Sequence, residues 1–316
     1  MSGKLSDPVV RAADPAGIAA AAELLRAGQL VAVPTETVYG LAARADSEAA
    51  VAAIYRAKGR PDFNPLIVHV AGLDQARTIA RLDERAELLA RHFWPGALTM
   101  VLPLLPEARI APAVTAGLPT IALRCPAHPA MRALLAESGL PLAAPSANRS
   151  GGVSPTTAAH VAASLAGRIP LVLDGGACAA GLESTIVALR DNGSWQLLRP
   201  GPIDAAQISA VLGTSPDVMT RPEIEAPGQL ASHYSPGKPV RLDAEIGEAD
   251  EFLIGFGPVA GAVSLSATGD LAEAAARLYA CLHKAASAPQ PRVAVARIPA
   301  DGLGAAINDR LRRAAA

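Results

Sequence analysis

Polar side chains that could bind a ligand gather in short segments directly after apolar runs. The first segment, residues 34–41, carries two threonines, a glutamate and a tyrosine after the apolar residues 30–33. The apolar run predicts a buried strand that Pro34 ends, and Gly40 permits a backbone path that a side chain would forbid. Open α/β sheets bind ligands at such strand ends. The segment is therefore a candidate ligand loop, with a polar turn as the alternative.

Two cations, Lys58 and Arg60, flank Gly59 at the end of a predicted helix. An arginine suits bidentate contact with phosphate or carboxylate, and a lysine supplies a compact charge. The C-terminus of a solvated helix favours cations as well, so both interpretations stay open. The same holds for Asn64, which precedes Pro65 and is compatible with a plain turn.

A third pair of polar residues, Thr120 and Arg124, flanks the apolar residues 121–123. Their spacing of four puts both on one face of a strand. An arginine is hard to bury there without an anionic partner, which favours a functional role for Arg124. His69 lies inside another apolar strand, 66–70, where a histidine satisfied within the core is the simpler interpretation.

Small hydroxyls, an amide and glycines follow one another in residues 146–152. We expect Ser154 or Thr156 to begin a helix after this loop. Backbone N–H groups and a helix N-terminus would then suit a bound anion.

Three more polar clusters follow along the chain. Ser184 comes after Glu183 at the start of one predicted strand, and Arg199 ends another. His233 and Tyr234 stand out in an otherwise bland segment, where an anchoring contact between domains is the alternative.

Common catalytic motifs are absent from the sequence. It has no phosphate loop of the type Gly-x4-Gly-Lys-Ser/Thr, no Gly-x-Ser-x-Gly elbow and no His-Glu-x-x-His. The six histidines and three cysteines show no metal-ligand spacing. Cations and hydroxyls at strand ends, without a nucleophile or a metal cage, suit a site that positions two anionic reactants and stabilises charge. Phosphoryl and nucleotidyl transfer require such a site.

Composition limits the class of protein. The 316 residues are 51% hydrophobic and 18% charged, enough for two domains with sizeable cores. A formal net charge of −1 argues against a dedicated nucleic-acid coat and permits a local basic groove. No apolar stretch reaches the length of a membrane span, and residues 1–14 lack the apolar core of a signal peptide. Three widely spaced cysteines fit a reducing cytoplasm.

The elements that must position these residues follow an α/β pattern. Helices are predicted at 15–27, 48–58, 83–93, 128–138, from 154 or 156 to about 166, and 204–212; strands are predicted at 30–34, 66–70, 97–102, 119–124, 171–174, 184–189 and 195–199. Beyond them, strands at 251–256 and 292–298 alternate with helices at 270–286 and 302–314, which implies a small parallel sheet. We divide the chain into a catalytic domain (1–212), a Pro-rich linker (213–238) and a small C-terminal α/β domain (239–316).

Taken in order over about residues 15–236, these segments resemble the YrdC-type threonylcarbamoyl-AMP synthases in their longer two-domain form. The matching segments are 34–41, 58–65, 93–98, 145–152, 154–156, 184–187, 198–201 and 233–236. Residues 240–316 fit the family's second domain by size and pattern. The resemblance implies an open, twisted, YrdC-like α/β domain with a concave active-site face, and a small Rossmann-like C-terminal domain.

The implied reaction joins L-threonine, bicarbonate and ATP into L-threonylcarbamoyladenylate and releases pyrophosphate. This is a nucleotidyl transfer that needs no protein nucleophile. Mg²⁺ is expected with the triphosphate, held mainly by phosphate oxygens and water. The product would pass to the t6A transferase machinery that modifies adenosine 37 of tRNA, and direct contact with tRNA is compatible with a local basic groove.

The family's binding positions carry over by motif. L-Threonine would be held by Thr37, His69, Arg124, the backbone of Ala144, and Ser184. ATP would be held by Arg60, Asn64, Thr120, Ser146, Ser154, Arg199 and Tyr234. Asn148 and Lys58 would complete the anion pocket, in which Lys58 and Arg60 offset developing charge.

Two positions depart from the family pattern. Residues 230–232 are Leu-Ala-Ser, where many relatives carry Lys-Tyr-Arg, so a cationic lid over the triphosphate must use other residues. Ala188 stands where many relatives have an aspartate. We expect the linker to act as a lid that the small domain anchors.

Two other functions remain as alternatives. An RNA-binding module would hold RNA on the concave face by phosphate contacts, but the net charge and the lack of a basic and aromatic stripe argue against it. A carbamoyl-transferring enzyme is the second, because hydrogenase-maturation carbamoyltransferases contain a related domain. Those chains are much longer and carry acylphosphatase and zinc-finger modules, which this sequence lacks.

Overall fold

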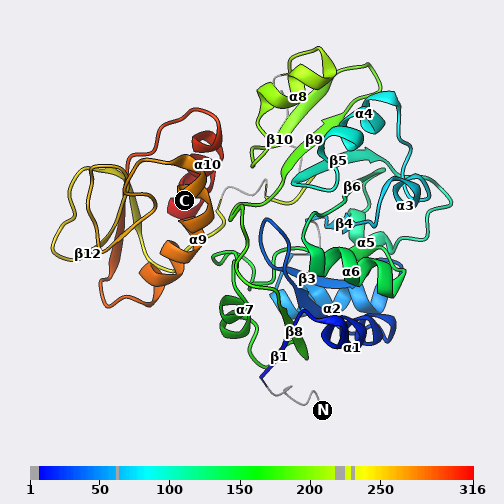
Figure 1. Cartoon of the computed structure of the whole chain (residues 1–316), viewed down its shortest axis with the longest axis horizontal. Coiled ribbons are helices and arrows are strands. Elements are labelled where there is room, and N and C mark those ends of the chain that lie inside the picture. The colour runs from blue at the N-terminus through cyan, green and yellow to red at the C-terminus, as the bar shows by residue number, and fades with distance from the viewer. Residues whose placement is uncertain (1–6, 62–63, 218–224, 229–231) are drawn as a thin grey trace.

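The chain folds into a larger N-terminal lobe and a smaller C-terminal lobe (Figure 1). The structure is a computed structural model that describes residues 7–61, 64–217, 225–228 and 232–316. Parts of the predicted linker, including Leu230 and Ala231, therefore lie outside the described residues. Within the described residues, no helix is long and apolar enough to cross a membrane.

A mixed sheet of ten strands runs through the larger lobe in the order β1-β8-β2-β3-β7-β4-β6-β5-β9-β10. The strands are β1 (Val9–Ala12), β2 (Val31–Val33), β3 (Gly40–Arg44), β4 (Ile67–His69), β5 (Leu98–Pro103), β6 (Thr120–Arg124), β7 (Leu142–Ala143), β8 (Leu171–Asp174), β9 (Thr185–Leu189) and β10 (Trp195–Arg199). β4 and β6 are parallel, with His69 beside Arg124, and β2 turns back antiparallel into β3. The sequence predicted seven of these strands and missed β1, β3 and β7.

Helices cover both faces of the first half of the sheet. Val31 and Val33 pack into the core formed with α1 (Pro15–Arg26) and α6 (Pro129–Ser138). Ala32, between them, packs into the opposite core with α2 (Glu48–Lys58). This is the period-two alternation of a strand buried on both sides. The side chains of Asp14 and Ser47 cap α1 and α2, as predicted.

Among the described residues, the other half of the sheet has helices on one face only. The core there includes α4 (Glu84–Phe93), α5 (Pro112–Thr115) and α8 (Ala205–Leu212), and α3 (Leu73–Arg77) and α7 (Ala158–Ser164) each contribute buried residues to the same core. The opposite face presents a small apolar cluster from β4, β5, β6, β9 and β10, and Ala226 of the linker packs on it. A sheet face covered by linker and not by a helix leaves room for a site beside it.

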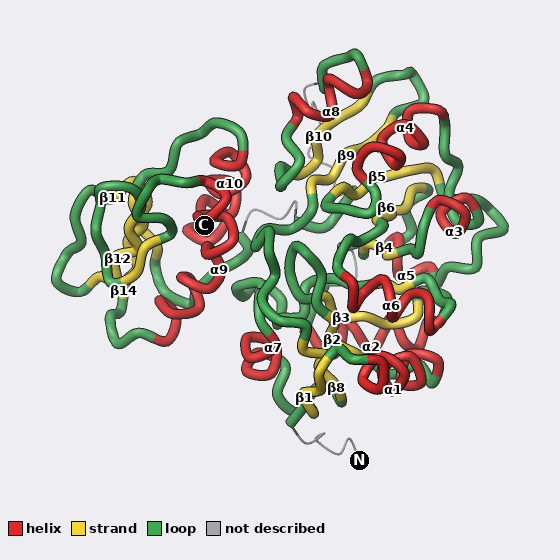
Figure 2. Tube along the Cα trace, in the orientation of Figure 1, coloured by secondary structure: helices red, strands yellow, loops and turns green. Residues whose placement is uncertain are grey.

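The smaller lobe is a parallel sheet, as predicted, with two helices on the side that faces the larger lobe (Figure 2). Its strands are β11 (Val240–Ala244), β12 (Glu251–Gly255), β13 (Val263–Ser264) and β14 (Arg292–Ala296), in the order β11-β14-β12-β13. The helices are α9 (Leu271–Ser287) and α10 (Leu303–Ala315). The predicted β-α-β-α pattern missed β11 and β13, which are only partly buried and show no continuous apolar run.

The helix after the 146–152 loop begins later than predicted. α7 starts at Ala158, and the side chain of Thr157 accepts a hydrogen bond from the backbone N–H of His160. Ser154 and Thr156 therefore do not cap it, and the prediction of either as the first residue of this helix is wrong. Gly40 lies where a side chain would be crowded, in agreement with the sequence analysis. It begins β3, where an added Cβ would lie 3.3 Å from the Cβ of Ala144.

Candidate active site

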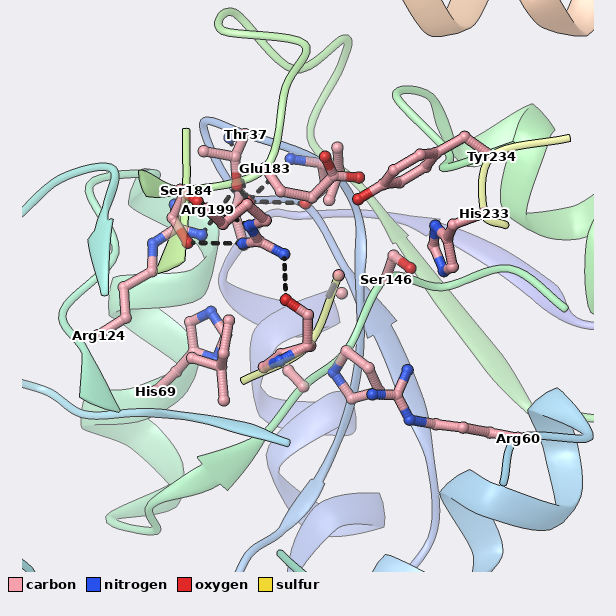
Figure 3. Close-up of a pocket in the computed structure, with 18 residues that line it drawn as sticks. Thr37, Arg60, His69, Arg124, Ser146, Glu183, Ser184, Arg199, His233 and Tyr234 are labelled. Atoms are coloured by element: carbon pink, nitrogen blue, oxygen red, sulfur yellow. Dashed lines mark hydrogen bonds between the residues drawn. The ribbon is translucent and has the colours of Figure 1, made fainter. Parts of the chain in front are cut away.

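One cavity collects most of the predicted residues at the exposed edge of the sheet face (Figure 3). Its wall includes Thr37, Arg60, His69, Arg124, Ala144, Ser146, Ser184, Arg199 and Tyr234. In Figure 3, Arg124 and His69 lie on one side, Arg60 and Tyr234 on the other, and Arg199 between them. Residues far apart in the sequence thus meet in a single hollow, as predicted.

The loop between β2 and β3 is fixed by its own hydroxyls. The Oγ1 of Thr35 donates to the carbonyl of Val38 at 2.6 Å and accepts the backbone N–H groups of Thr37 and Val38, both at 3.2 Å. The hydroxyls of Thr35 and Thr37 are 2.8 Å apart. This turn brings the Thr37 hydroxyl to the cavity wall in a defined position.

Arg124, at the end of β6, uses its guanidinium to join three chain segments. Nη2 donates to Oε1 of Glu36 at 2.6 Å, Nη1 to the hydroxyl of Thr37 at 2.9 Å, and Nε to the carbonyl of Gly96 at 3.1 Å. Glu36 also accepts the backbone N–H of Ala127. Burial raises the pKa of Glu36, but the charge and hydrogen bond of Arg124 outweigh it and hold that pKa below its usual value. The expected anionic partner of Arg124 is thus Glu36, within the protein.

His69 is buried beside Arg124 and stays neutral. Burial and the positive charge of Arg124 lower its pKa to about 3. Its Nδ1 has no hydrogen-bond partner among the described residues, although the histidine lines the cavity. His69 is therefore part of the cavity wall as well as of the core, and its unpaired Nδ1 is free to hydrogen-bond with a ligand.

Arg199, at the end of β10, ties two strands to the linker. Nε donates to the carbonyl of Ser184 at 3.0 Å and Nη2 to its hydroxyl at 3.1 Å, while Nη1 reaches the carbonyl of Pro227 at 3.3 Å. The Ser184 hydroxyl also lies 2.7 Å from that of Thr99. Burial lowers the pKa of Arg199 below its usual value.

Two further cations approach the cavity from the end of α2. Arg60 lines the wall and donates to the carbonyls of Asn64 and Pro65 at 3.0 to 3.3 Å, and burial lowers its pKa to about 10, which still leaves it charged at pH 7. Lys58 is buried behind the wall. Its Nζ donates to the carbonyls of Ser146 and Asn148 at 2.5 and 2.6 Å, so it holds the 146–152 loop in place. Burial, with the nearby charge of Arg60, lowers its pKa well below the usual value.

Four other predicted residues do not line the cavity. The side-chain oxygens of Asn64 and Asn148 are buried without a partner among the described residues, and Ser154 donates to Glu183 at 2.6 Å. Thr120 lies at the opposite end of β6 from Arg124, paired with Pro103.

Sequence reasoning assigned no ligand role to four residues in or beside the wall, although all four lie in segments that it singled out. Thr35, Glu183 and His233 line the cavity, and Glu36 binds Arg124 beside it. Three of the four immediately precede a predicted site residue in the chain. Burial lowers the pKa of His233 to about 3, and its Nδ1 has no partner in the described part of the chain. Adjacency to a predicted residue was the available signal, but a neighbour in a strand usually points to the opposite face.

Comparison with known proteins decides the family. Residues 23–201 match the family model described as "Telomere recombination", and residues 203–316 match "Threonylcarbamoyl-AMP synthase, C-terminal domain". The chain belongs to the threonylcarbamoyl-AMP synthase family.

Named members of this family support the assignment over nearly the whole chain. The threonylcarbamoyl-AMP synthase of Pyrococcus abyssi is 39% identical over 93% of this chain and 92% of its own length. That of Bacillus subtilis is 50% identical over 71% of this chain and 66% of its own length. A solved structure, "P. abyssi Sua5 complexed with L-threonine", is 36% identical, covers 98% of this chain and 97% of that chain, and has a TM-score of 0.87. The two-domain architecture and the α/β fold are thereby confirmed.

Proposed function

We propose that this chain condenses L-threonine, bicarbonate and ATP into L-threonylcarbamoyladenylate and pyrophosphate. The single observation that carries the proposal is the convergence of Thr37, Arg60, Arg124, Ser146 and Ser184 on one cavity. They come from five separate segments of the chain, and together they supply cations and hydroxyls without a nucleophile. The solved relative with L-threonine supports an amino acid as one of the two ligands.

The amino-acid substrate fits the side of the cavity around Arg124. This guanidinium has N–H groups left after its contacts with Glu36, Thr37 and Gly96, and a carboxylate would accept them. The neutral His69 offers its unpaired Nδ1 nearby. L-Threonine would therefore place its carboxylate on Arg124 and its polar groups against His69, Ser184 and the backbone of Ala144.

The nucleotide fits the side around Arg60 and Arg199. Three basic groups, Arg60, Lys58 and Arg199, approach this side, and Ser146 and Tyr234 complete its wall. Buried cations in a site of low dielectric stabilise a triphosphate and the charge that develops on pyrophosphate. The unpaired amide oxygens of Asn64 and Asn148 are acceptors for ligand hydroxyl or amino groups.

The reaction has two steps, carbamate formation and nucleotidyl transfer, and the cavity residues would support both. The threonine amine and bicarbonate form a carbamate with loss of water, and the carbamate oxygen attacks the α-phosphorus in line while pyrophosphate departs. The protein aligns the two reactants and offsets charge with Arg60 and Arg199 at the cavity wall, while Lys58 holds the 146–152 loop behind it. Proximity and electrostatic stabilisation are sufficient classes of catalysis for this transfer.

Mg²⁺ would accompany the triphosphate. Among the described residues there is no group of three or more His, Cys, Asp or Glu side chains that could hold a metal ion. The two carboxylates near the cavity, Glu36 and Glu183, are engaged by Arg124 and Arg310. A metal would therefore be held by phosphate oxygens and water, which suits Mg²⁺.

The linker would act as a lid over the nucleotide. Pro227, Gly228, His233 and Tyr234 form part of the cavity wall, and the space open to water inside it is about 50 Å³. That space holds a few water molecules, whereas pockets for ligands of drug size measure roughly 300–1,000 Å³. Entry of ATP thus requires the linker to move outward, and its return would exclude water.

The experiment is incubation with labelled threonine, bicarbonate and ATP, followed by assay for pyrophosphate and for the adenylate. Formation of both, dependent on all three substrates, is expected. Absence of pyrophosphate release together with salt-dependent RNA binding would favour an RNA-binding module.

The product would pass to the machinery that makes t6A in tRNA. The free, buried cysteines fit a reducing cytoplasm as the compartment for this chain.

A further inference from the structure

The smaller lobe reaches the cavity through one buried carboxylate. Glu183 lines the cavity and precedes Ser184, yet its partners come largely from the C-terminal domain. The hydroxyl of Tyr279 on α9 lies 2.8 Å and 3.0 Å from its two oxygens, and Nε of Arg310 on α10 donates to Oε2 at 2.9 Å. Ser154 of the larger lobe donates to Oε1 at 2.6 Å.

These contacts are buried and close. Tyr279 and Arg310 are both completely buried, and Glu183 is 6% exposed. Gly181 explains how α9 comes so near: its φ is +67°, and an added Cβ would lie 2.4 Å from the carbonyl oxygen of Ala275. The chain therefore accepts only glycine two residues before Glu183, and this close approach holds α9 against the segment that carries Glu183.

The same pair of residues also supports the aromatic wall of the linker. The guanidinium of Arg310 lies 5.6 Å from the centre of the Tyr234 ring, and the rings of Tyr234 and Tyr279 are 5.5 Å apart. Tyr234 has a φ of +65°, a backbone conformation that needs support from its surroundings. Arg310 and Tyr279 thus contact both the carboxylate and the linker tyrosine of the nucleotide side.

The negative charge of Glu183 affects how well the cavity can bind an anionic ligand. Three donors, the hydroxyls of Tyr279 and Ser154 and the Nε of Arg310, hold both oxygens of the Glu183 carboxylate. Burial alone would raise the pKa of Glu183, but the charges of Arg310 and Arg199 and the Ser154 hydrogen bond lower it to about 2. The carboxylate is therefore an anion next to the proposed triphosphate site, where Arg310, together with Arg199, offsets its negative charge.

We propose that Tyr279 and Arg310 are positioning residues for the nucleotide, contributed by the C-terminal domain, which hold and neutralise Glu183 so that the cavity accepts a triphosphate. The inference rests on the proposed function and adds a reason for the second domain. The threonine side is built without these residues. Changes in them therefore affect ATP and leave threonine binding nearly unchanged.

Tyr279→Phe removes one hydroxyl and keeps the ring. We expect the KM for ATP to rise about tenfold, the usual scale for a lost hydrogen bond to a charged group, while the KM for threonine stays within twofold. The control is Arg241→Gln, which breaks the ion pair with Glu251 inside the same lobe, away from the cavity. It should leave both KM values unchanged.

A charge rescue separates positioning from simple destabilisation. Arg310→Gln should raise the KM for ATP more than Tyr279→Phe does, because Glu183 is left uncompensated. Adding Glu183→Gln removes that repulsion, so the double variant should bind ATP better than Arg310→Gln alone. Equal weakening of ATP and threonine, no rescue, or the same rise in the Arg241→Gln control would overturn the inference.

ATP affinity is also measured directly by calorimetry on the full-length wild type and variants. An inactive wild type that still binds ATP would count against the proposed function, whereas the ratio of ATP affinities would still decide the role of Tyr279 and Arg310. Thermal unfolding of each variant identifies any that fail to fold. In that event Tyr279→Phe, the smallest change, provides the deciding measurement.

Discussion

The two sides of the cavity are built in different ways. The threonine side consists of Glu36, Thr37, His69 and Arg124, all in the larger lobe and held by strand ends and one tight turn. The nucleotide side adds the linker residues His233 and Tyr234.

Beyond the linker, the nucleotide side also depends on Glu183, which the second lobe holds through Tyr279 and Arg310. The threonine side is therefore complete within the larger lobe, whereas the nucleotide side is assembled from both lobes and the linker between them. A preformed amino-acid site next to an adjustable nucleotide site is consistent with a linker that must move to admit ATP.

The largest effect is expected on the threonine side. Arg124→Ala should weaken threonine binding by about 2–5 kcal/mol, the usual cost of leaving one member of a buried charge pair without its partner. ATP affinity should change much less, because Arg124 does not reach the nucleotide side. Calorimetry with threonine and with ATP measures both.

Glu36 complicates this variant, since Arg124→Ala also leaves its carboxylate without a cation. The double variant Glu36→Gln/Arg124→Ala serves as the control. It should recover part of the lost stability and none of the threonine affinity. Unchanged threonine affinity in Arg124→Ala would reject the assigned role.

A smaller effect is expected from a substitution of Lys58. Comparing its effects on stability and on the KM for ATP tests whether Lys58 supports the loop at the cavity or only stabilises the fold. Lys58→Met removes the two hydrogen bonds to the carbonyls of Ser146 and Asn148, and should cost about 1–3 kcal/mol of unfolding free energy. The 146–152 loop would then shift, so the KM for ATP should rise. Denaturant unfolding and steady-state kinetics measure the two quantities.

The chain offers a matched control for this change. Lys238, at the end of the linker, makes the same kind of contact with the smaller lobe: its Nζ donates to the carbonyls of Ala285 and Ala288 at 2.8 and 2.5 Å. Because Lys238 is only half-buried, Lys238→Met should lose less stability than Lys58→Met, and it should not raise the KM for ATP. If both variants raise the KM equally, the kinetic effect comes from reduced stability and the supporting role of Lys58 is wrong.

The sequence predicted the helices and strands of the larger lobe better than it predicted the side-chain contacts between them. Apolar runs and caps such as Asp14 and Ser47 identify elements because their signals are local. The partner of Arg124 and the orientation of Ser154 depend on long-range contacts, 88 residues away in the chain for Glu36 and 29 for Glu183. The roles of Tyr279 and Arg310 had no signal at all, since both occupy ordinary helix positions.

The smallest effect concerns pH and again distinguishes the buried threonine side. The pKa of His69 is lowered to about 3 in the folded protein, whereas an unfolded histidine has its ordinary value of 6.5. Below pH 6.5 the unfolded chain therefore binds a proton that the folded protein does not bind until about pH 3, so stability falls as the pH falls. Because His69 is only 3% exposed, solvent screens this effect little.

Between pH 6 and pH 5, wild type should lose about 1 kcal/mol more unfolding free energy than His69→Asn, which has no such group to titrate. Near pH 8 the difference in unfolding free energy between the two proteins should not change with pH, because the histidine is neutral in both the folded and the unfolded state there. Denaturant unfolding across this range measures the two slopes. Parallel plots of unfolding free energy against pH would mean that His69 gains a proton in the folded state as readily as in the unfolded chain. The threonine side of the cavity would then be open to water, contrary to the burial of His69 in the fold.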